Sequence, residues 1–159
     1  MTDEAQSAQQ EPAGEPIDLL AFLPENFSEI AYVTQINVKR KSMAHLNAEL
    51  EKHAPKGRRG TIQVKNKDYT LIFNTVIDML GDKNMLVFLE AIKTVELLSD
   101  ILGPLQMIKQ AKAKILINLL ASKYGETKTA VIAAVDKAIL AMVRREVFSP
   151  VQFVDMCIN

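Results

Sequence analysis

Two consecutive runs, YTLIFNTVIDML at residues 69–80 and MLVFLEAIKTVELLSDIL at residues 85–102, decide the fold of this chain. The first run has the three- and four-residue spacing of an amphipathic α-helix, with Tyr69, Ile72, Phe73, Val76, Ile77 and Leu80 on one face. The second run is apolar on nearly all sides, so we expect a helix buried between neighbours. Gly81 and the polar residues 82–84 separate the runs. They predict a helical hairpin in which Gly81 is a left-handed helix stop.

The hairpin pattern recurs after Gly103-Pro104, which combines a helix stop with a proline suited to the start of the next helix. LQMIKQAKAKILINLLA at 105–121 and TAVIAAVDKAILAMV at 129–143 are the two runs of this second hairpin. The expected inward positions are Leu105, Ile108, Ala111, Ile115, Leu119, Val131, Val135, Ala138, Ile139 and Met142. Tandem hairpins of about forty residues each are typical of an α-solenoid of the HEAT or armadillo kind.

The flanking sequence extends this array. A helix capped by Asn26, with Glu29 in the reciprocal position, and a second helix from Asn37 to His53 predict a hairpin in front. In it we expect Phe27, Ile30, Ala31, Val38, Met43, Leu46 and Leu50 to face inward and Lys39 to face outward. Ser149-Pro150 predicts the start of one more helix. The prediction is therefore an all-α, HEAT-like α-solenoid over residues 17–159, with hairpins at about 26–53, 67–102 and 104–143 and a partial one at 149–159.

The remaining segments are expected to be irregular. Residues 1–16 are rich in Gln, Glu, Ala and Pro and predict a disordered acidic tail. The apolar segment 17–23 ends before Pro24, and we expect it to pack against the first hairpin. Residues 54–65 contain one proline and two glycines around basic residues and predict a surface loop.

The charge distribution is more informative than the net charge, which is zero. Residues 1–30 carry seven acids and no base, whereas residues 35–68 carry nine bases and three acids. A neutral total argues against a dedicated nucleic-acid binder. The basic band suits an acidic protein partner, or it is a solvated surface. The acidic N-terminus and the absence of an apolar run of about 18 residues predict a cytoplasmic protein with no membrane partner.

No motif predicts an enzyme. His45 and His53 are eight residues apart, and no cysteine or carboxylate stands at metal-ligand spacing, so we expect no metal site. Cys157 is the single cysteine, for which an inert buried thiol is the favoured interpretation. Residues 81–84 lack the glycine–lysine frame of a phosphate-binding loop. The sequence therefore predicts no catalytic residue, no metal and no cofactor.

The turns within the predicted hairpins are evenly spaced. Ile36 and Asn84 are 48 residues apart, and Asn84 and Lys128 are 44 residues apart, which fits repeats of the HEAT size. In an α-solenoid such turns line up along one edge, and that edge is a ready binding surface.

At these turns the sequence resembles a TOG domain of the ch-TOG and minispindles class of microtubule polymerases. Residues 18–27, DLLAFLPENF, resemble the family's "sklPkdF" entry, and residues 81–87, GDKNMLV, resemble its "kDsNvvV" turn. Residues 124–131 resemble its "kekKptV" segment, and residues 35–43 stand where the family has "kkWqeRkeaL". The resemblance covers Ile17 to Asn159, about three and a half of the family's six repeats, and the motifs occur in the family's order.

The resemblance implies a cytoskeletal protein of microtubules, spindle and centrosome that binds αβ-tubulin or microtubule plus ends. The implied tubulin contacts are Ile36, Lys39, Asn84, Met85 and Lys128. Ile36 replaces the family's tryptophan and Lys39 its arginine, so less apolar area and no bidentate fork are available. These differences predict weaker tubulin binding. The alternatives are a HEAT scaffold for a centrosomal or kinetochore protein, and a nucleic-acid binder that uses the basic residues 56–67.

Overall fold

A computed structural model describes residues 15–54, 62–110 and 112–158, except for the side chains at 103–106, 108–110, 112–113, 124 and 156–157. Two short 3-10 helices, η1 (Leu19–Phe22) and η2 (Phe27–Tyr32), precede the α-helices. These are α1 (Ile36–His53), α2 (Thr70–Leu80), α3 (Met85–Gln110), α4 (Lys112–Gly125), α5 (Thr129–Arg144) and α6 (Pro150–Ile158). Among the described residues the β-structure amounts to a single bridge, so the predicted all-α class is confirmed.

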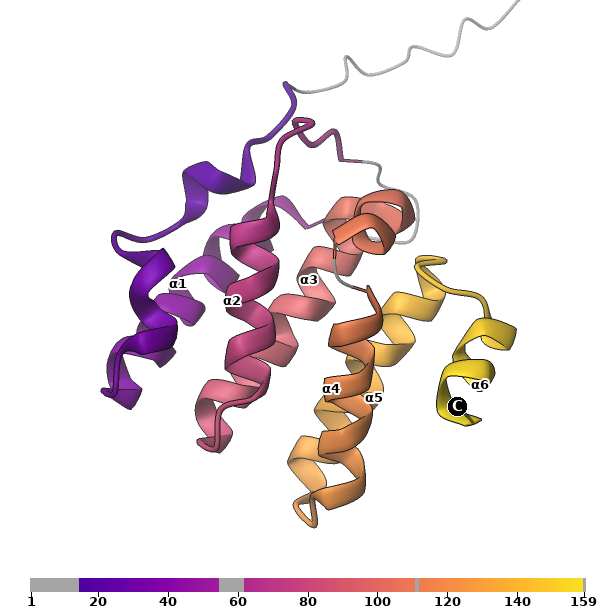
Figure 1. Ribbon diagram of the computed structural model, residues 1–159. Coiled ribbons are helices and arrows are strands. Elements are labelled where there is room, and N and C mark those ends of the chain that lie inside the picture. Colours follow the sequence, from indigo (N-terminus) through magenta and orange to yellow (C-terminus); the bar gives the residue numbers. More distant parts are fainter. Residues whose placement is uncertain (1–14, 55–61, 111, 159) are drawn as a thin grey trace, which may run out of the picture.

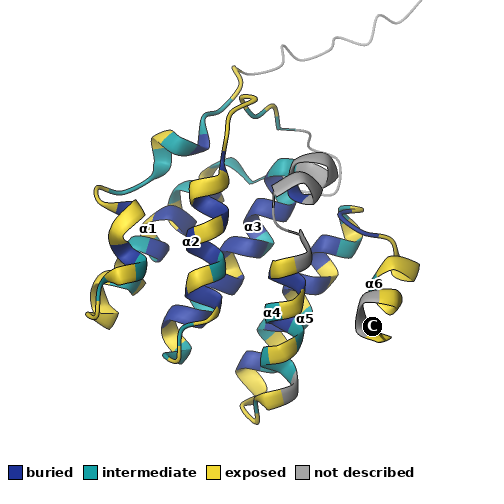
Figure 2. Cartoon of the chain, viewed as in Figure 1, coloured by how far each residue is buried: buried dark blue, intermediate teal, exposed yellow. Residues whose placement is uncertain are grey.

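The helices form two layers (Figure 1). In one layer α3 packs between α1 and α5, and in the other α2 packs between η2 and α4. Consecutive elements also pair across the layers: η2 with α1, α2 with α3, and α4 with α5. Figure 2 shows that the dark blue, buried residues lie where these layers meet. The core therefore runs along the whole array between the two layers.

The predicted inward faces of the central helices are largely confirmed. The α2 residues Tyr69 to Leu80 at the predicted positions are buried, except Ile77, which is partly exposed. The predicted inward residues of α5 are all buried. α3 contacts α1, α2, α4 and α5, which explains why its sequence is apolar on nearly all sides. Leu105, Ile108 and Ala111 lie outside the described side chains, whereas Ile115 and Leu119 are buried.

Two predicted helix ends are wrong. Gly81 has a φ of −87°, so it ends α2 in a right-handed conformation, and its N–H donates to the carbonyls of Ile77 and Asp78. α3 continues through Gly103-Pro104 to Gln110. A proline inside a helix removes one hydrogen bond and costs about 3 kcal/mol. Ile101 and Met107, on either side, are both buried, and we attribute the continuous helix to this burial.

The first hairpin also differs from its prediction. Its leading element is a 3-10 helix, and Asn26 has a left-handed φ of 60° with no side-chain capping bond, so the predicted capping box is absent. Six residues gain few α-type hydrogen bonds, which favours the tighter helix. Phe27 and Ile30 are nevertheless buried as expected. Val38, expected inside, is 37% exposed, and Lys39, expected outside, is largely covered.

The N-terminal segment lies against the first hairpin, as predicted. Leu19 is fully buried and η1 packs against α1. Ile17 pairs with Val64 in a parallel bridge: Ile17 N–H donates to Gln63 O (2.9 Å) and Lys65 N–H donates to Ile17 O (2.8 Å). An ion pair between Asp18 and Lys67 lies beside this bridge and lowers the pKa of the Asp18 carboxyl. Residues 1–14 of the predicted tail (1–16) and residues 55–61 of the predicted loop (54–65) lie outside the described residues.

A buried polar cluster joins α1 to α3. Asn47, which is 1% exposed, donates to the carbonyl of Glu90 (3.0 Å) and to its Oε2 (2.9 Å). The hydroxyl of Thr94, which has one proton to donate, lies 2.6 Å from Asn47 Oδ1 and 2.9 Å from the Glu90 carbonyl oxygen. Every polar atom of the Asn47 amide group is thereby engaged, which buried polar groups require. The cluster fixes the register of α1 on α3.

Candidate functional site

Three turns lie along one edge of the molecule, which is the lower edge in Figure 1. We call it the turn edge. Turn 1 comprises residues 33–36, turn 2 residues 81–85 and turn 3 residues 126–129. Figure 2 shows exposed residues in yellow at each turn. The helices α1, α3 and α5 all begin at this edge. The structure therefore brings the five sequence-predicted contact residues to one side of the molecule.

Turn 1 presents apolar side chains to solvent. Ile36 is 44% exposed, so the predicted apolar anchor is accessible, and Val38 is 37% exposed. Tyr32, at the end of η2, is 86% exposed and was missed by sequence reasoning. The sequence contained an indication of it, because Tyr32 does not share the expected inward face of Phe27, Ile30 and Ala31. An exposed aromatic residue is a common interface anchor.

Lys39 is not free at this edge. Its ammonium group makes a 2.8 Å ion pair with Asp82 of turn 2, and the two side chains are 15% and 13% exposed. Burial raises the pKa of Asp82, but hydrogen bonds from Lys39 and from the N–H of Asn84, together with the Lys39 charge, lower it further, to below its ordinary 3.8. The Asp82 carboxyl is therefore ionised at neutral pH. The pair links the start of α1 to turn 2. Lys39, which the resemblance implies as a tubulin contact, is therefore already paired within the chain.

Asn84 also serves the fold. Its side-chain Oδ1 accepts hydrogen bonds from the N–H groups of Leu86 (3.0 Å) and Val87 (3.3 Å), which caps α3. Asp82 Oδ1 accepts from Asn84 N–H at 2.8 Å, so the turn is held from both sides. Asn84 is thus positioned by the turn, and its side-chain oxygen is already engaged by α3.

In turn 3 the side chain of Lys128, the residue directly before α5, is exposed. No side chain caps α5, and among the described residues Lys128 makes no ion pair. Glu126 lies close by, but its carboxylate accepts from the N–H groups of Thr127 and Lys128, both at 3.2 Å. The Lys128 ammonium is therefore available to a partner.

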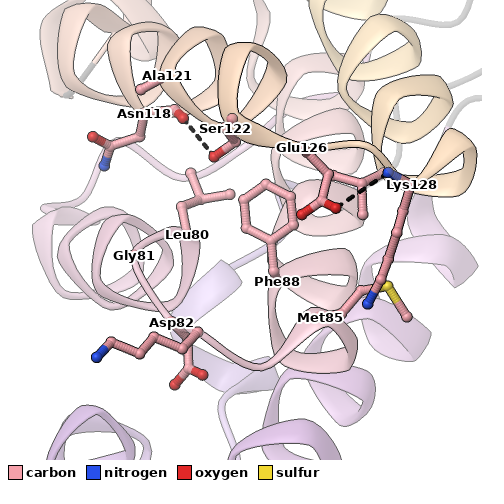
Figure 3. Close-up of a pocket in the computed structure, with 13 residues that line it drawn as sticks. Leu80, Gly81, Asp82, Met85, Phe88, Asn118, Ala121, Ser122, Glu126 and Lys128 are labelled. Carbon is pink, nitrogen blue, oxygen red and sulfur yellow. Dashed lines mark hydrogen bonds between the residues drawn. The ribbon is translucent and has the colours of Figure 1, made fainter.

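A groove of about 500 Å³ lies between turn 2 and turn 3. Its lining residues are Leu80, Gly81, Asp82, Lys83, Met85, Phe88, Asn118, Ala121, Ser122, Gly125, Glu126, Lys128 and Val131. Figure 3 shows Leu80 and Phe88 side by side in the middle of the groove and the Lys128 side chain extending toward Met85. Two of the predicted contact residues, Met85 and Lys128, thus share one site. Ile36 and Lys39 are not among its lining residues.

The backbone adds positive potential to the turn edge. The N-termini of α1, α3 and α5 carry partial positive charge. None of these three helices has an acidic residue in its first turn. Asp82 and Glu126 lie just before α3 and α5, and their carboxylates accept backbone N–H groups of the turns. The first turns themselves add no acid to this edge.

The described residues hold no group of three or more His, Cys, Asp or Glu side chains that a metal ion would need. His53 stacks on Phe22 at a centroid distance of 4.8 Å, and His45 is exposed on α1. The side chain of Cys157 lies outside those described. Among the described helices, none combines the length and apolarity of a membrane span.

Comparison of the chain with protein-family models, with curated proteins and with solved structures returned no match.

Proposed function

We propose that the chain is an array of HEAT-like helical hairpins that binds αβ-tubulin through its turn edge, in the manner of the TOG domains it resembles. Its role is binding without catalysis, on microtubules and at the spindle and centrosome in the cytoplasm. One observation carries the proposal. Met85 and Lys128, which the resemblance implies as tubulin contacts from two different turns, line one groove at that edge.

Two properties of the edge support an acidic protein as the partner. The first turns of the helices that begin there contain no acid, and Lys83 and Lys128 are exposed. Complementary potentials accelerate association and select partners. Exposed apolar residues at turn 1, Tyr32 and Ile36 in particular, add area that a partner would bury. The two-layer packing of paired helices supports the HEAT-like array.

The test is binding of purified αβ-tubulin to the purified chain, measured by interferometry and by co-elution in size-exclusion chromatography. We expect a dissociation constant in the micromolar range that is lost in the double variant Met85→Asp, Lys128→Glu. Lys137→Glu is the matched control, because its side chain is 73% exposed on α5 but does not line the groove. A folded wild-type chain that leaves tubulin free would overturn the proposal.

One observation favours a second candidate, a HEAT scaffold for a different acidic protein of the centrosome or kinetochore. The ion pair with Asp82 occupies Lys39, which stands where the family has an arginine. Together with Ile36 in place of tryptophan, this weakens two of the contacts that the resemblance implies. Capture of a non-tubulin centrosomal or kinetochore protein by the wild type, but not by the double variant, would support this candidate.

A further inference from the structure

We infer that the groove between turn 2 and turn 3 binds one apolar side chain that is flanked by carboxylates on an acidic protein segment. The inference rests on the proposed function, because it names the feature of the partner that the turn edge would recognise. It comes from the groove's own composition, an apolar floor with a basic rim.

The floor of the groove is formed by apolar side chains from different helices. Phe88 of α3 is 7% exposed, Leu80 of α2 is 4% exposed and Val131 of α5 is 1% exposed. Met85 is partly exposed and lines the same groove. Methionine adapts its shape to different ligands and makes favourable contacts with aromatic rings. The volume of about 500 Å³ lies within the range of about 300–1,000 Å³ of binding clefts.

The rim is effectively basic although it contains two acids and two lysines. The carboxylate of Asp82 is engaged by Lys39 and by Asn84 N–H, and that of Glu126 by two backbone N–H groups. Among the described residues, neither Lys83 nor Lys128 has an ion-pair partner. Both are exposed. Asp82 is paired with Lys39, so in the part of the chain that the structure describes Lys83 and Lys128 face a single carboxylate without a cationic partner, that of Glu126; the rim is net positive and complements carboxylates.

The groove also fits a chain segment better than an enclosed small molecule. Gly81 and Gly125 line it. Gly81 directly follows α2 before turn 2, and Gly125 is the last residue of α4 before turn 3. No atom lies within 4 Å of a Cβ placed on Gly125, and both glycines are exposed, so a backbone can approach them closely. The site therefore combines a pocket for one side chain with room for the polypeptide on both sides of it.

The experiment titrates the full chain with a short fluorescent peptide in which one phenylalanine is flanked by glutamates. Two control peptides replace the phenylalanine by glycine or the glutamates by lysines. We expect saturable anisotropy for the first peptide and binding weaker by roughly tenfold or more for both controls. In ¹H–¹⁵N spectra the amide signals of Gly81 and Gly125 should shift with the same affinity.

Two variants test the groove directly. Met85→Glu and Lys128→Glu should each weaken peptide binding by roughly tenfold, and Lys137→Glu, which makes the same charge change away from the groove, should leave it within about twofold. Circular dichroism confirms that the variants fold. Equal binding of the phenylalanine and glycine peptides, or shifts that avoid Gly81 and Gly125, would overturn the inference.

The outcomes separate this inference from the proposed function. Peptide binding in the groove by a chain that ignores αβ-tubulin would refute the tubulin assignment and retain the groove as a site for another acidic protein. Tubulin binding that survives both Met85→Glu and Lys128→Glu would retain tubulin as the partner and refute the groove as its site.

Discussion

The two junctions along the turn edge differ. An ion pair bridges turn 1 and turn 2, whereas a groove separates turn 2 from turn 3. At the first junction Lys39 reaches across to Asp82, and deeper in the interface Asn47 joins α1 to α3 through Glu90 and Thr94. At the second junction the corresponding cations, Lys83 and Lys128, have no acidic partner among the described residues, and a groove remains.

This difference indicates where the turn edge leaves charges free for a partner. Charges that pair across a junction stabilise the stacking of hairpins, but they are lost to a partner. At the second junction α3 packs on α5, and the ion pairs between these helices are peripheral: Lys137 with Glu96 (3.5 Å) and Arg145 with Asp100 (2.9 Å). These lie away from the turns, so the edge itself stays available.

The strongest test of the first junction is Asn47→Ala. It removes hydrogen bonds to Glu90 and Thr94 at a site that is 1% exposed and leaves a small cavity. We expect the free energy of unfolding to fall by about 2–3 kcal/mol, measured by urea denaturation. Asn74→Ala, on the exposed face of α2, is the control and should change stability by about 0.5 kcal/mol or less. Equal effects would show that the cluster does not stabilise the junction.

A double-mutant cycle of Lys39→Ala and Asp82→Ala measures the link between turns 1 and 2. Because both side chains are largely covered and their charged atoms are 2.8 Å apart, we expect a coupling energy of about 1 kcal/mol. Additive single effects would mean that the turns are not energetically linked. The Asp82→Ala arm also removes the acceptor of Asn84 N–H, a contribution that the cycle cancels.

The Lys39–Asp82 pair should also affect how the free energy of unfolding changes at acidic pH, by a smaller amount. The pKa of Asp82 is lower in the folded chain than its ordinary 3.8, the net result of burial, which raises it, and of the donors from Lys39 and Asn84, which lower it. Its contribution is therefore complete above pH 3.8 and is lost as the pH falls through the lower folded value. As the pH falls below 3.8, Asp82→Asn should therefore lose less stability than the wild type. Parallel losses in thermal melts would contradict this.

The smallest effect is expected at the second junction. Lys137→Met removes an ion pair with Glu96 in which the lysine side chain is 73% exposed. Exposed pairs contribute little, so the free energy of unfolding should change by less than about 0.5 kcal/mol and the change should vanish in high salt. A loss comparable to the Lys39–Asp82 coupling would remove the contrast between the two junctions.

Periodicity predicted the helices well because burial of a face depends on local spacing. Three sets of predictions are confirmed: the inward residues of α2 apart from Ile77, those of α5, and the buried surroundings of α3. The Ser149 cap of α6 is confirmed as well, because its hydroxyl accepts from Gln152 N–H. Local signals failed where a distant residue decided. Gly103-Pro104 is a strong local break, yet α3 continues because its face is buried on both sides of the proline.

The candidate site was predicted less completely for the same reason. Ile36, Met85 and Lys128 are accessible at the turn edge, but the partner of Lys39 lies 43 residues away in sequence, and spacing within one helix gave no indication of it. Asn47 likewise depends on α3. The groove is made by two hairpins together, so neither hairpin's sequence predicts it. Whether these residues contact tubulin stays a prediction.

The bridge between Ile17 and Val64 has a kinetic consequence. Two backbone hydrogen bonds, from Ile17 N–H to Gln63 and from Lys65 N–H to Ile17, close a loop that contains the whole of η2 and α1. Once this loop is closed, η2 and α1 have less conformational entropy to gain by detaching. The amides of Ile17 and Lys65, although outside any helix, should therefore exchange their hydrogens slowly and at similar rates. Their common exchange rate would report the rate at which the first hairpin opens as one cooperative unit.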